Sequence, residues 1–410
     1  MSAPHAPHAS LWSLRFISME ATSGVVLLVA AALAFAWANS PWAHAYEQLW
    51  RLRITPGVAP GLLPVEDLHF WVNDGLMTVL FLLVGLEIRR EVHDGALSDP
   101  KIATLPIVAA LGGVVLPALL YVLINTDPTA RRGWAIPTAT DIAFAVGVLS
   151  LIARVSPALR LLLLTLAIID DIGAILVIAI FYSNGLAPGG FLIVAAGVLL
   201  ALAMQWLGIA AAAAYVLPGA VVWFGMLRSG VHPTLAGVLL GLLTPVTPAF
   251  GLRRRNPALL SEESPVMRVE AMLHPYVAFG IMPVFALANA GVSLQGLDLS
   301  GSVPLTIAAG VAAGLVLGKP LGISLAVLGA VRLRLCALPD GVRWPQALLL
   351  GVLGGIGFTM SIFIANLAFD DPVLLAAAKL AVLIASVVAA ALGVVLGLLQ
   401  PSPHALRARV

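Results

Sequence analysis

Apolar residues in this chain are grouped into long runs, and short polar stretches separate one run from the next. A helix needs about 20 residues to cross a hydrocarbon core of roughly 30 Å. Because about twelve runs approach this length, we predict about twelve membrane-spanning helices. The predicted spans cover residues 24–38, 70–86, 102–124, 134–152, 159–181, 191–207, 210–227, 231–243, 273–292, 303–331, 347–369 and 373–399.

The amino-acid composition agrees with a membrane protein. Of the 410 residues 60% are hydrophobic and 10% are charged, and the mean hydropathy is +1.03, whereas soluble domains carry about 25% charged residues. The net charge of +2 gives no basic surface that would favour nucleic acid, and the single cysteine, Cys336, excludes an intramolecular disulfide. We therefore predict an all-α polytopic membrane protein with one domain, residues 1–410.

Three stretches outside the spans have their own character. Residues 1–12 are rich in Pro, His and Ala, and we predict a disordered tail. Residues 39–67 form a long loop, in which 50–55 alternate like a strand before a Pro-Gly turn signal, so that a β-hairpin is possible. Residues 244–268 form a second long loop, and three consecutive arginines begin at Arg253.

Positive charges are distributed unequally between the two sides of the predicted bundle. Of the 22 basic residues, 15 fall on the side that holds both termini and five fall on the other, while Lys319 and Lys379 lie within spans. Cytoplasmic loops carry the excess of Lys and Arg. The sequence therefore predicts that both termini and the 244–268 loop are cytoplasmic and that the 39–67 loop is periplasmic.

Two predicted spans are interrupted. The fourth contains Pro137, which lacks a backbone N–H, and the eleventh has four glycines between Gly351 and Gly357. The glycines could equally form a face for close helix packing. However, the interrupted spans are the middle members of two triplets, spans three to five and ten to twelve. Broken spans in matching positions are typical of transporters with inverted repeats, so we predict that arrangement.

Two adjacent carboxylates, Asp170 and Asp171, lie in the middle of the fifth apolar run. An ionised side chain at that depth costs at least about 2.5 kcal/mol on insertion scales, and intramembrane acids mark ion or proton pathways. Adjacent helical positions point about 100° apart, so one carboxylate can face a cavity and the other the bundle. Two close carboxylates also titrate as a coupled pair. The pair therefore predicts an ion or proton site within the membrane.

The chain closely resembles the NhaA family of bacterial Na+/H+ antiporters. The resemblance covers nearly everything from Gly24 to Leu399. It implies twelve helices with crossed, broken fourth and eleventh helices. It also implies electrogenic, pH-regulated exchange of internal Na+ or Li+ for external protons across the bacterial inner membrane, with no cofactor. The strings that carry it are 81–87, 133–144, 167–171, 229–232, 288–294, 318–322 and 357–361.

The resemblance assigns roles to residues around the acidic pair. Asp170 and Asp171 become the oxygens for which Na+ and protons compete, and Thr140 and Asp141 support them. Lys319 becomes the charge partner of Asp170, either as a structural ion pair or as a carrier of a transported proton. Asp141 balances the positive helix N-termini at the crossing, or is a cap with no contact to Na+.

A second cluster resembles the pH-sensing region of the family. Histidine titrates in the physiological range, and acids nearby couple to it. Two residues depart from the family pattern, because Ala271 stands where relatives often have histidine and Met267 where a lysine can occur. The residues predicted to sense pH are Glu87, Arg90, Glu91, Glu270, His274 and His232, of which His232 has the alternative role of a helix-start packing residue.

Other functions fit the sequence less well. An intramembrane aspartyl protease places its two acids on different helices, one of them in Gly-x-Gly-Asp, and that string is absent. A proton- or sodium-coupled symporter of a small organic anion, on a related broken-helix fold, stays as the alternative function. The strand-like residues 50–55 also suggest an edge-to-edge contact in a homodimer.

Overall fold

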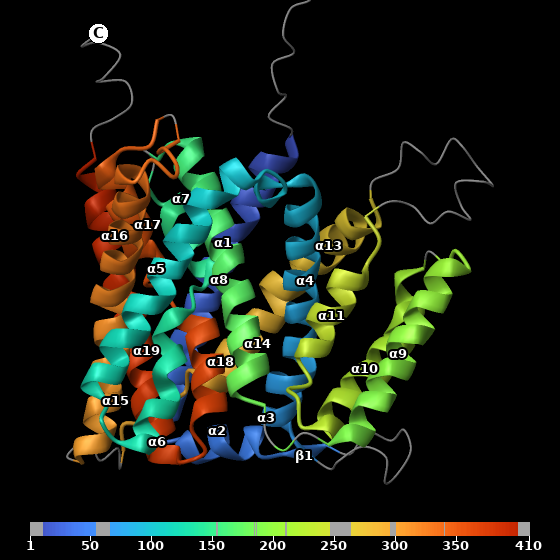
Figure 1. Cartoon of the computed structure of the whole chain (residues 1–410). Helices are drawn as coiled ribbons and strands as arrows, with labels where there is room; N and C mark the ends of the chain where they lie inside the picture. The colour runs from blue at the N-terminus through green and yellow to red at the C-terminus, as the bar shows by residue number, and fades with distance from the viewer. Residues whose placement is uncertain are drawn as a thin grey trace, which may run out of the picture.

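The computed structural model describes residues 11–54, 66–152, 155–183, 185, 187–209, 211–246, 264–295, 301–339 and 341–400. Most of these residues form helices that run between the two ends of an upright bundle (Figure 1). The first helix begins, and the last one ends, at the same end of the bundle, and the opposite end carries the short β-strands (Figure 1). The arginines from 253 and most of the 1–12 tail lie outside the described residues.

In the described part of the chain, eighteen α-helical segments, interrupted by other helical types, make up the bundle. They are α1 (Leu11–Ala38), α2 (Ala43–Trp50), α3 (Leu68–Phe70), α4 (Met77–Asp94), α5 (Pro100–Ile124), α6 (Pro128–Arg131), α7 (Ile142–Ser150), α8 (Pro157–Phe181), α9 (Pro188–Trp206), α10 (Val216–Ser229), α11 (Leu235–Leu243), α13 (Pro265–Tyr276), α14 (Met282–Asn289), α15 (Ser302–Ala313), α16 (Lys319–Arg332), α17 (Trp344–Gly354), α18 (Phe358–Ala368) and α19 (Pro372–Leu398).

Three of the remaining helical segments have the tighter 3-10 geometry, namely η2 (Ala96–Ser98), η3 (Arg132–Thr138) and η4 (Ala212–Tyr215). Three others are π-helical: η1 (Trp71–Leu76), η6 (Val277–Ile281) and η7 (Gly314–Gly318). Each π segment continues one helix into the next, so α3–α4, α13–α14 and α15–α16 are continuous rods. Such π turns inside helices occur often at functional sites.

The starts of the spans follow from a local sequence signal. A polar N-cap residue is followed by proline, whose fixed φ suits the first helical position and whose missing N–H would be unpaired there anyway. The cap accepts hydrogen bonds from the first turn, as in Asp371, which binds the N–H groups of Val373 and Leu374. The same pairing begins α5, α6, α8 and α13.

The predicted all-α polytopic fold with broken helices is confirmed. In the described part of the chain, eight helices are long and apolar enough to cross a membrane, and eleven candidates result if each bent pair counts as one span. The α6–η3 segment bends by 45° before α7, and α17 bends by 43° before α18. The nine-residue α11 is too short to cross a bilayer alone. The twelve-span count and the inverted repeats therefore stay predictions.

The region predicted to be a strand is partly helical, and that prediction was wrong for Trp50. Tyr46 and Trp50 are buried residues of α2, one helical turn apart, and this spacing forms an apolar helical face. The Tyr46 hydroxyl donates to the carbonyl of Leu287, 2.8 Å away, and so fixes α2 against the end of α14. Only Arg53–Ile54 (β1) is extended, and it pairs antiparallel with Glu66–Asp67 (β2).

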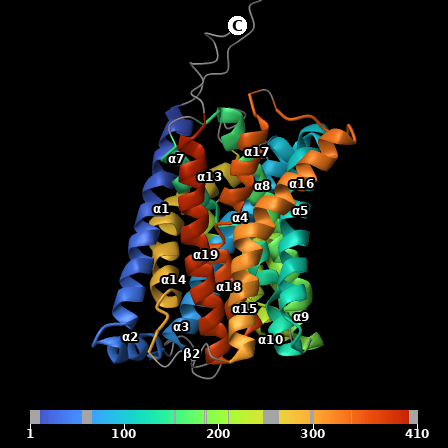
Figure 2. The same cartoon turned by 90° about the vertical axis from the view of Figure 1, so that its left-hand side faces the viewer.

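The functional elements lie inside the bundle. Figure 2 shows α19 in front of α18, and α16 beside α5. The α8 helix packs against α5, α7, α17 and α4. Its two central carboxylates, Asp170 and Asp171, are 1% and 3% exposed, so they are buried among helices and do not face lipid.

Candidate functional site

The two broken helices cross, and their breaks contact each other directly. The N–H of Asp141 donates to the carbonyl of Ile356 at 2.7 Å, across the two breaks. The hydroxyl of Ser361 donates to the carbonyl of Ile136, also at 2.7 Å. Backbone groups freed by each break are thus satisfied by the other broken helix, which makes non-helical backbone tolerable at this depth.

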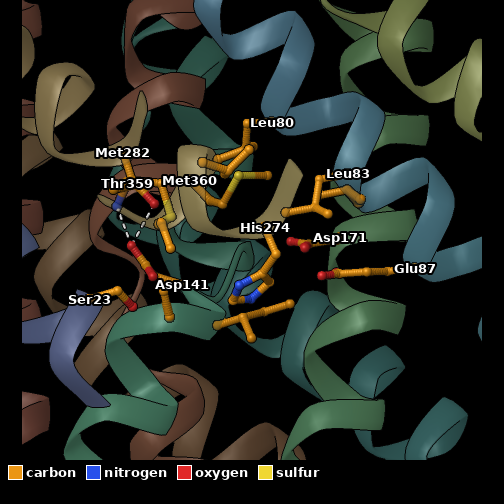
Figure 3. A pocket seen from close by; sticks show the side chains of 15 residues that line it. Ser23, Leu80, Leu83, Glu87, Asp141, Asp171, His274, Met282, Thr359 and Met360 are labelled. Carbon is orange, nitrogen blue, oxygen red and sulfur yellow. Dashed lines mark hydrogen bonds between the residues drawn. The ribbon is translucent and has the colours of Figure 1, made fainter. Parts of the chain in front are cut away.

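Asp141 binds the first turns of two half-helices at once. Its Oδ1 accepts from the N–H of Phe144 in α7 at 2.9 Å, and its Oδ2 accepts from the N–H of Thr359 in α18 at 3.0 Å and from the Thr359 hydroxyl (Figure 3). A negative charge is favourable at a helix N-terminus. This geometry fits the predicted balancing role of Asp141, and the residue also lines a cavity.

Asp170 is held by two partners. Its Oδ2 is paired with the ammonium of Lys319, and both side chains are fully buried. The hydroxyl of Thr140 lies 2.6 Å from the same oxygen and 2.7 Å from the Lys319 ammonium. Lys319 begins α16, directly after the π turn η7. The structure therefore brings together Thr140, Asp170 and Lys319, as the sequence predicted, and the ion pair neutralises two buried charges.

Asp171 points to a different place. It lines a cavity of about 80 Å³, which we call the site cavity, together with Ser23, Glu87, Asp141, His274 and Thr359 (Figure 3). This volume can hold several water molecules. The divergence of Asp170 and Asp171 follows from the rotation of about 100° between adjacent helical positions.

Two carboxylate oxygens of this pair lack partners. Among the residues that the structure describes, none donates a hydrogen bond to Oδ1 of Asp170 or to Oδ1 of Asp171. A buried ionised oxygen without a partner is costly. A proton or a cation would remove this cost, and carboxylate oxygens are ligands that hard cations prefer. The pair is thus suited to hold either a proton or a cation.

The predicted pH-sensing residues lie at the end of the bundle where α1 begins, with one exception. Arg90 on α4 and Glu270 on α13 form an ion pair of 2.7 Å. The carboxylate of Glu91 accepts a hydrogen bond from the N–H of Ala96 at 2.7 Å and so fixes the chain that follows the C-terminus of α4. Glu87 and His274 line the site cavity. The cluster thus connects α4 and α13 beside the cavity.

His232 is separate from this cluster. It lies between α10 and α11 at the end of the bundle that carries the β-strands, and its Nε2 is 2.8 Å from the carbonyl oxygen of Tyr182. Burial lowers the pKa of His232, and the nearby carbonyl only partly offsets this. Its ring is therefore neutral at pH 7 and ties α11 to the end of α8. The positions that depart from the family pattern, Ala271 and Met267, are exposed on α13.

Sequence reasoning missed a second buried polar group. Asn289 donates to Asn73 at 2.9 Å, while its Oδ1 accepts from Asn366 at 2.8 Å and from the Lys379 ammonium at 3.3 Å. Single polar residues in four separate spans give no pattern along the chain. The one available signal was Lys379, a basic residue inside an apolar run.

The double cap gives a stability prediction. Asp141→Ala removes the acceptor of buried N–H groups at two helix starts, and each unsatisfied buried donor costs about 1–3 kcal/mol. We expect a lower Tm in detergent, measured by differential scanning fluorimetry. Asp371→Ala is the matched control, because it also removes a cap with two N–H donors but at an exposed site. An equal loss in both variants would contradict the argument.

Comparison with known proteins agrees with this geometry. A family model described as Na+/H+ antiporter 1 matches residues 14–396. A protein named Na(+)/H(+) antiporter NhaA from Acidovorax sp. (strain JS42) is 55% identical, over 96% of this chain and 93% of that protein. A protein of the same name from Janthinobacterium sp. (strain Marseille) is 53% identical, over 94% and 92% of the two chains.

The fold also has a solved counterpart. The structure of the sodium proton antiporter MjNhaP1 from Methanocaldococcus jannaschii covers 95% of this chain, and this chain covers 98% of it, with a TM-score of 0.53. At 12% sequence identity this likeness concerns the fold alone. The family match and the relatives above 50% identity decide the classification: the chain is a multi-pass membrane protein that belongs to the Na+/H+ antiporter 1 family, whose members are secondary transporters.

Proposed function

We propose that this protein exchanges cytoplasmic Na+ or Li+ for external protons at Asp170 and Asp171. The observation that carries the proposal is the pair of buried carboxylate oxygens without partners, next to the crossing of two broken helices. The relatives are named as Na+/H+ antiporters over nearly their whole length. A bundle of buried helices with intramembrane carboxylates supports the same activity.

Competition between ions provides the exchange. Protons and Na+ occupy the same carboxylate oxygens, so the protein carries one or the other but not both. Lys319 is paired with Oδ2 of Asp170, which leaves Oδ1 of that carboxylate for an ion. Thr140 and Asp141 support the site from the crossing. More than one proton per Na+ makes the cycle electrogenic.

The orientation follows from charge. We propose that the end carrying β1 and β2 faces the periplasm and that both termini face the cytoplasm, in the bacterial inner membrane. The site cavity, with Glu87 and His274 in its wall, then communicates with the cytoplasmic half of the bundle. Alternating access requires this half to close and the other half to open. The strand β1 is exposed, and we propose it as a contact in a homodimer.

An organic-anion symporter has no support from these observations. The described residues that line the site cavity include Glu87, Asp141 and Asp171, and no Lys or Arg is among them. Such an acidic surface repels an organic anion. The relatives compared above are all named as antiporters.

The central prediction concerns the acidic pair. Asp170→Asn and Asp171→Asn should each abolish Na+-dependent dissipation of a proton gradient in everted membrane vesicles, because each removes a ligand and a titrating group. The side-chain volume hardly changes, so the purified variants should remain folded on size-exclusion chromatography. Asp99→Asn, at the exposed cap of α5, is the matched control and should retain exchange. Exchange that persists in either core variant would overturn the assignment.

Because Na+ and protons share the carboxylate oxygens, the direction in which Na+ affinity changes with pH can be predicted. Protons compete with Na+, so Na+ affinity of the unmutated protein should weaken as the pH falls. Isothermal titration calorimetry at several pH values measures this. An affinity independent of pH, in a protein that still exchanges, would require separate sites for the two ions.

Cys336 tests the orientation. It lies between α16 and α17 at the end where α1 begins, and it is partly exposed. A membrane-impermeant maleimide should label it in everted vesicles but not in intact cells. Burial raises the pKa of the Cys336 thiol, and the thiolate is the reactive form, so labelling should accelerate as the pH rises above neutral. Labelling in intact cells would reverse the proposed orientation.

The Arg90–Glu270 pair tests regulation by pH. We propose that it biases the packing of α13 against α4. Gln resembles the protonated acid, so if loss of protons activates exchange, Glu270→Gln should move the activation midpoint to higher pH. Exchange in everted vesicles across a pH series gives the midpoint. A uniform loss of activity without a shift would make the pair purely structural.

A further inference from the structure

Three helices that wall the site cavity continue together toward the β-strand end of the bundle. They are α4, α14 and α18, which contribute Leu80, Met282 and Met360 to the cavity. Six or seven residues farther along each rod there is an asparagine: Asn73, Asn289 and Asn366. At 1.5 Å per residue, this places the asparagines roughly 10 Å from the cavity.

Three aromatic rings meet beside this stretch: Phe285 and Phe363 lie between the two levels of α14 and α18, and Phe81 lies at the cavity level of α4. Phe81 on α4, Phe285 on α14 and Phe363 on α18 are at most 1% exposed. The ring of Phe363 lies 5.3 Å from that of Phe81 and 6.4 Å from that of Phe285, measured between centroids. The path from the site cavity toward the β-strand end is therefore closed by an apolar layer made from the same three helices.

The three asparagines form a hydrogen-bonded layer beyond the rings, which we call the amide layer. Asn289 is at its centre, because it donates to Asn73 and accepts from Asn366. Asn73 also contacts the ring of His69 at 3.0 Å. One acceptor, Oδ1 of Asn366, is buried and has no partner among the described residues. The layer is thus polar, incompletely satisfied and located where the three rods converge.

Lys379 from α19 adds a positive charge to this layer. It is 8% exposed, and its ammonium reaches Oδ1 of Asn289 at 3.3 Å. No ion pair with a carboxylate is present for it in the part of the chain that the structure describes. Asn289 ends α14 and Asn366 lies in the last turn of α18, and helix C-termini favour a nearby cation. Two helix ends and one amide oxygen therefore face this ammonium, and no carboxylate among the described residues is paired with it.

A second cavity lies on the far side of the amide layer. It has a volume of about 260 Å³ at the β-strand end, and its wall includes Glu47, Asp67, His69 and Ala288. His69 contacts Asn73, and Ala288 precedes Asn289 in α14. The wall also includes Arg51, 3.9 Å from Glu47. The aromatic and amide layers thus separate this outer cavity from the site cavity.

We propose that the amide layer is the outer gate of the ion path. We also propose that Lys379 in this gate determines the affinity for Na+ on the outer side. The inference rests on the proposed exchange of Na+ for protons. The ammonium repels Na+ that approaches from the outer cavity, and so it lowers the affinity for Na+ on that side. Outward release then needs the amide layer to separate, which moves Asn289 and Lys379 away from the axis of the path.

The test compares Na+ affinity from the two sides of the membrane. Uptake of radioactive Na+ driven by a proton gradient is measured in right-side-out and in everted vesicles, which expose the outer and the cytoplasmic side respectively. In Lys379→Met, the KM for Na+ from the outer side should fall several-fold, on the order of fivefold, because a like charge is removed. The ratio of the outer to the cytoplasmic KM should fall with it.

Conservative variants separate charge from packing. Lys379→Arg keeps the charge and should keep the KM ratio of the unmutated protein. Lys379→Gln is a second neutral variant and should behave like Lys379→Met. The role of Lys379 would be overturned if both neutral variants still exchange ions and have the same KM ratio as the unmutated protein. If both neutral variants fail to insert while Lys379→Arg inserts, the charge serves folding and the proposal is wrong.

The same experiment distinguishes failure of the underlying function. If the unmutated protein shows no Na+ flux coupled to a proton gradient in either type of vesicle, the proposed exchange itself is wrong. If the unmutated protein exchanges normally but the neutral variants leave the ratio of outer to cytoplasmic KM unchanged, the gate proposal is wrong and the proposed exchange stands.

Discussion

The carboxylate of Asp141 accepts hydrogen bonds from the first turns of α7 and α18, and this double cap makes the crossing of two broken helices possible. A helix interrupted inside a membrane exposes unpaired backbone groups and partial charges that lipid cannot satisfy. Here the N–H groups of both half-helices converge on one negative side chain, and backbone groups of each break bind the other. Backbone groups of the irregular segments at the centre are thereby hydrogen-bonded within the protein.

The acidic pair depends on this arrangement. Thr140, one residue before the cap, places its hydroxyl against Asp170 and Lys319. Oδ2 of Asp170 is thus paired within the protein, whereas Asp171 faces the site cavity, and Oδ1 of each carboxylate has no partner among the described residues. The same two residues, adjacent in sequence, therefore experience different environments. A site that exchanges ions needs such an asymmetry, because a fully paired carboxylate binds no ion and a fully hydrated one gives little selectivity.

Charge is compensated at two levels of the bundle by different means. At the crossing, an acid faces helix N-termini, while Lys319 is paired with an acid. Nearer the β-strand end, Lys379 is held by helix C-termini and an amide. A buried ion pair has no net charge. An ammonium that is compensated only by partial charges keeps a positive electrostatic potential around it. We therefore expect these two intramembrane lysines to act differently on a passing cation.

The sequence by itself determined the membrane class, the broken helices and the acidic pair, because each of these features depends on residues that are adjacent in the sequence. Apolar runs, Pro137, the glycines up to Gly357 and two neighbouring aspartates are local signals, and hydrocarbon imposes strict requirements on each of them. The pairing of Lys319 with Asp170 came from family resemblance, since no local rule joins residues 149 positions apart.

Only the tertiary structure decided which oxygens are paired, that α2 is a helix, and that three asparagines from separate spans form the amide layer beside Lys379. Residues 50–55 alternate like a strand in isolation, but Trp50 shares a helical face with Tyr46, which is fixed against the end of α14. Asn73, Asn289 and Asn366 give no pattern along the chain, and Lys379 stands out only as a basic residue inside an apolar run. They meet because four helices pack side by side, and helix packing depends on side-chain shapes across the whole bundle rather than on any single stretch of sequence.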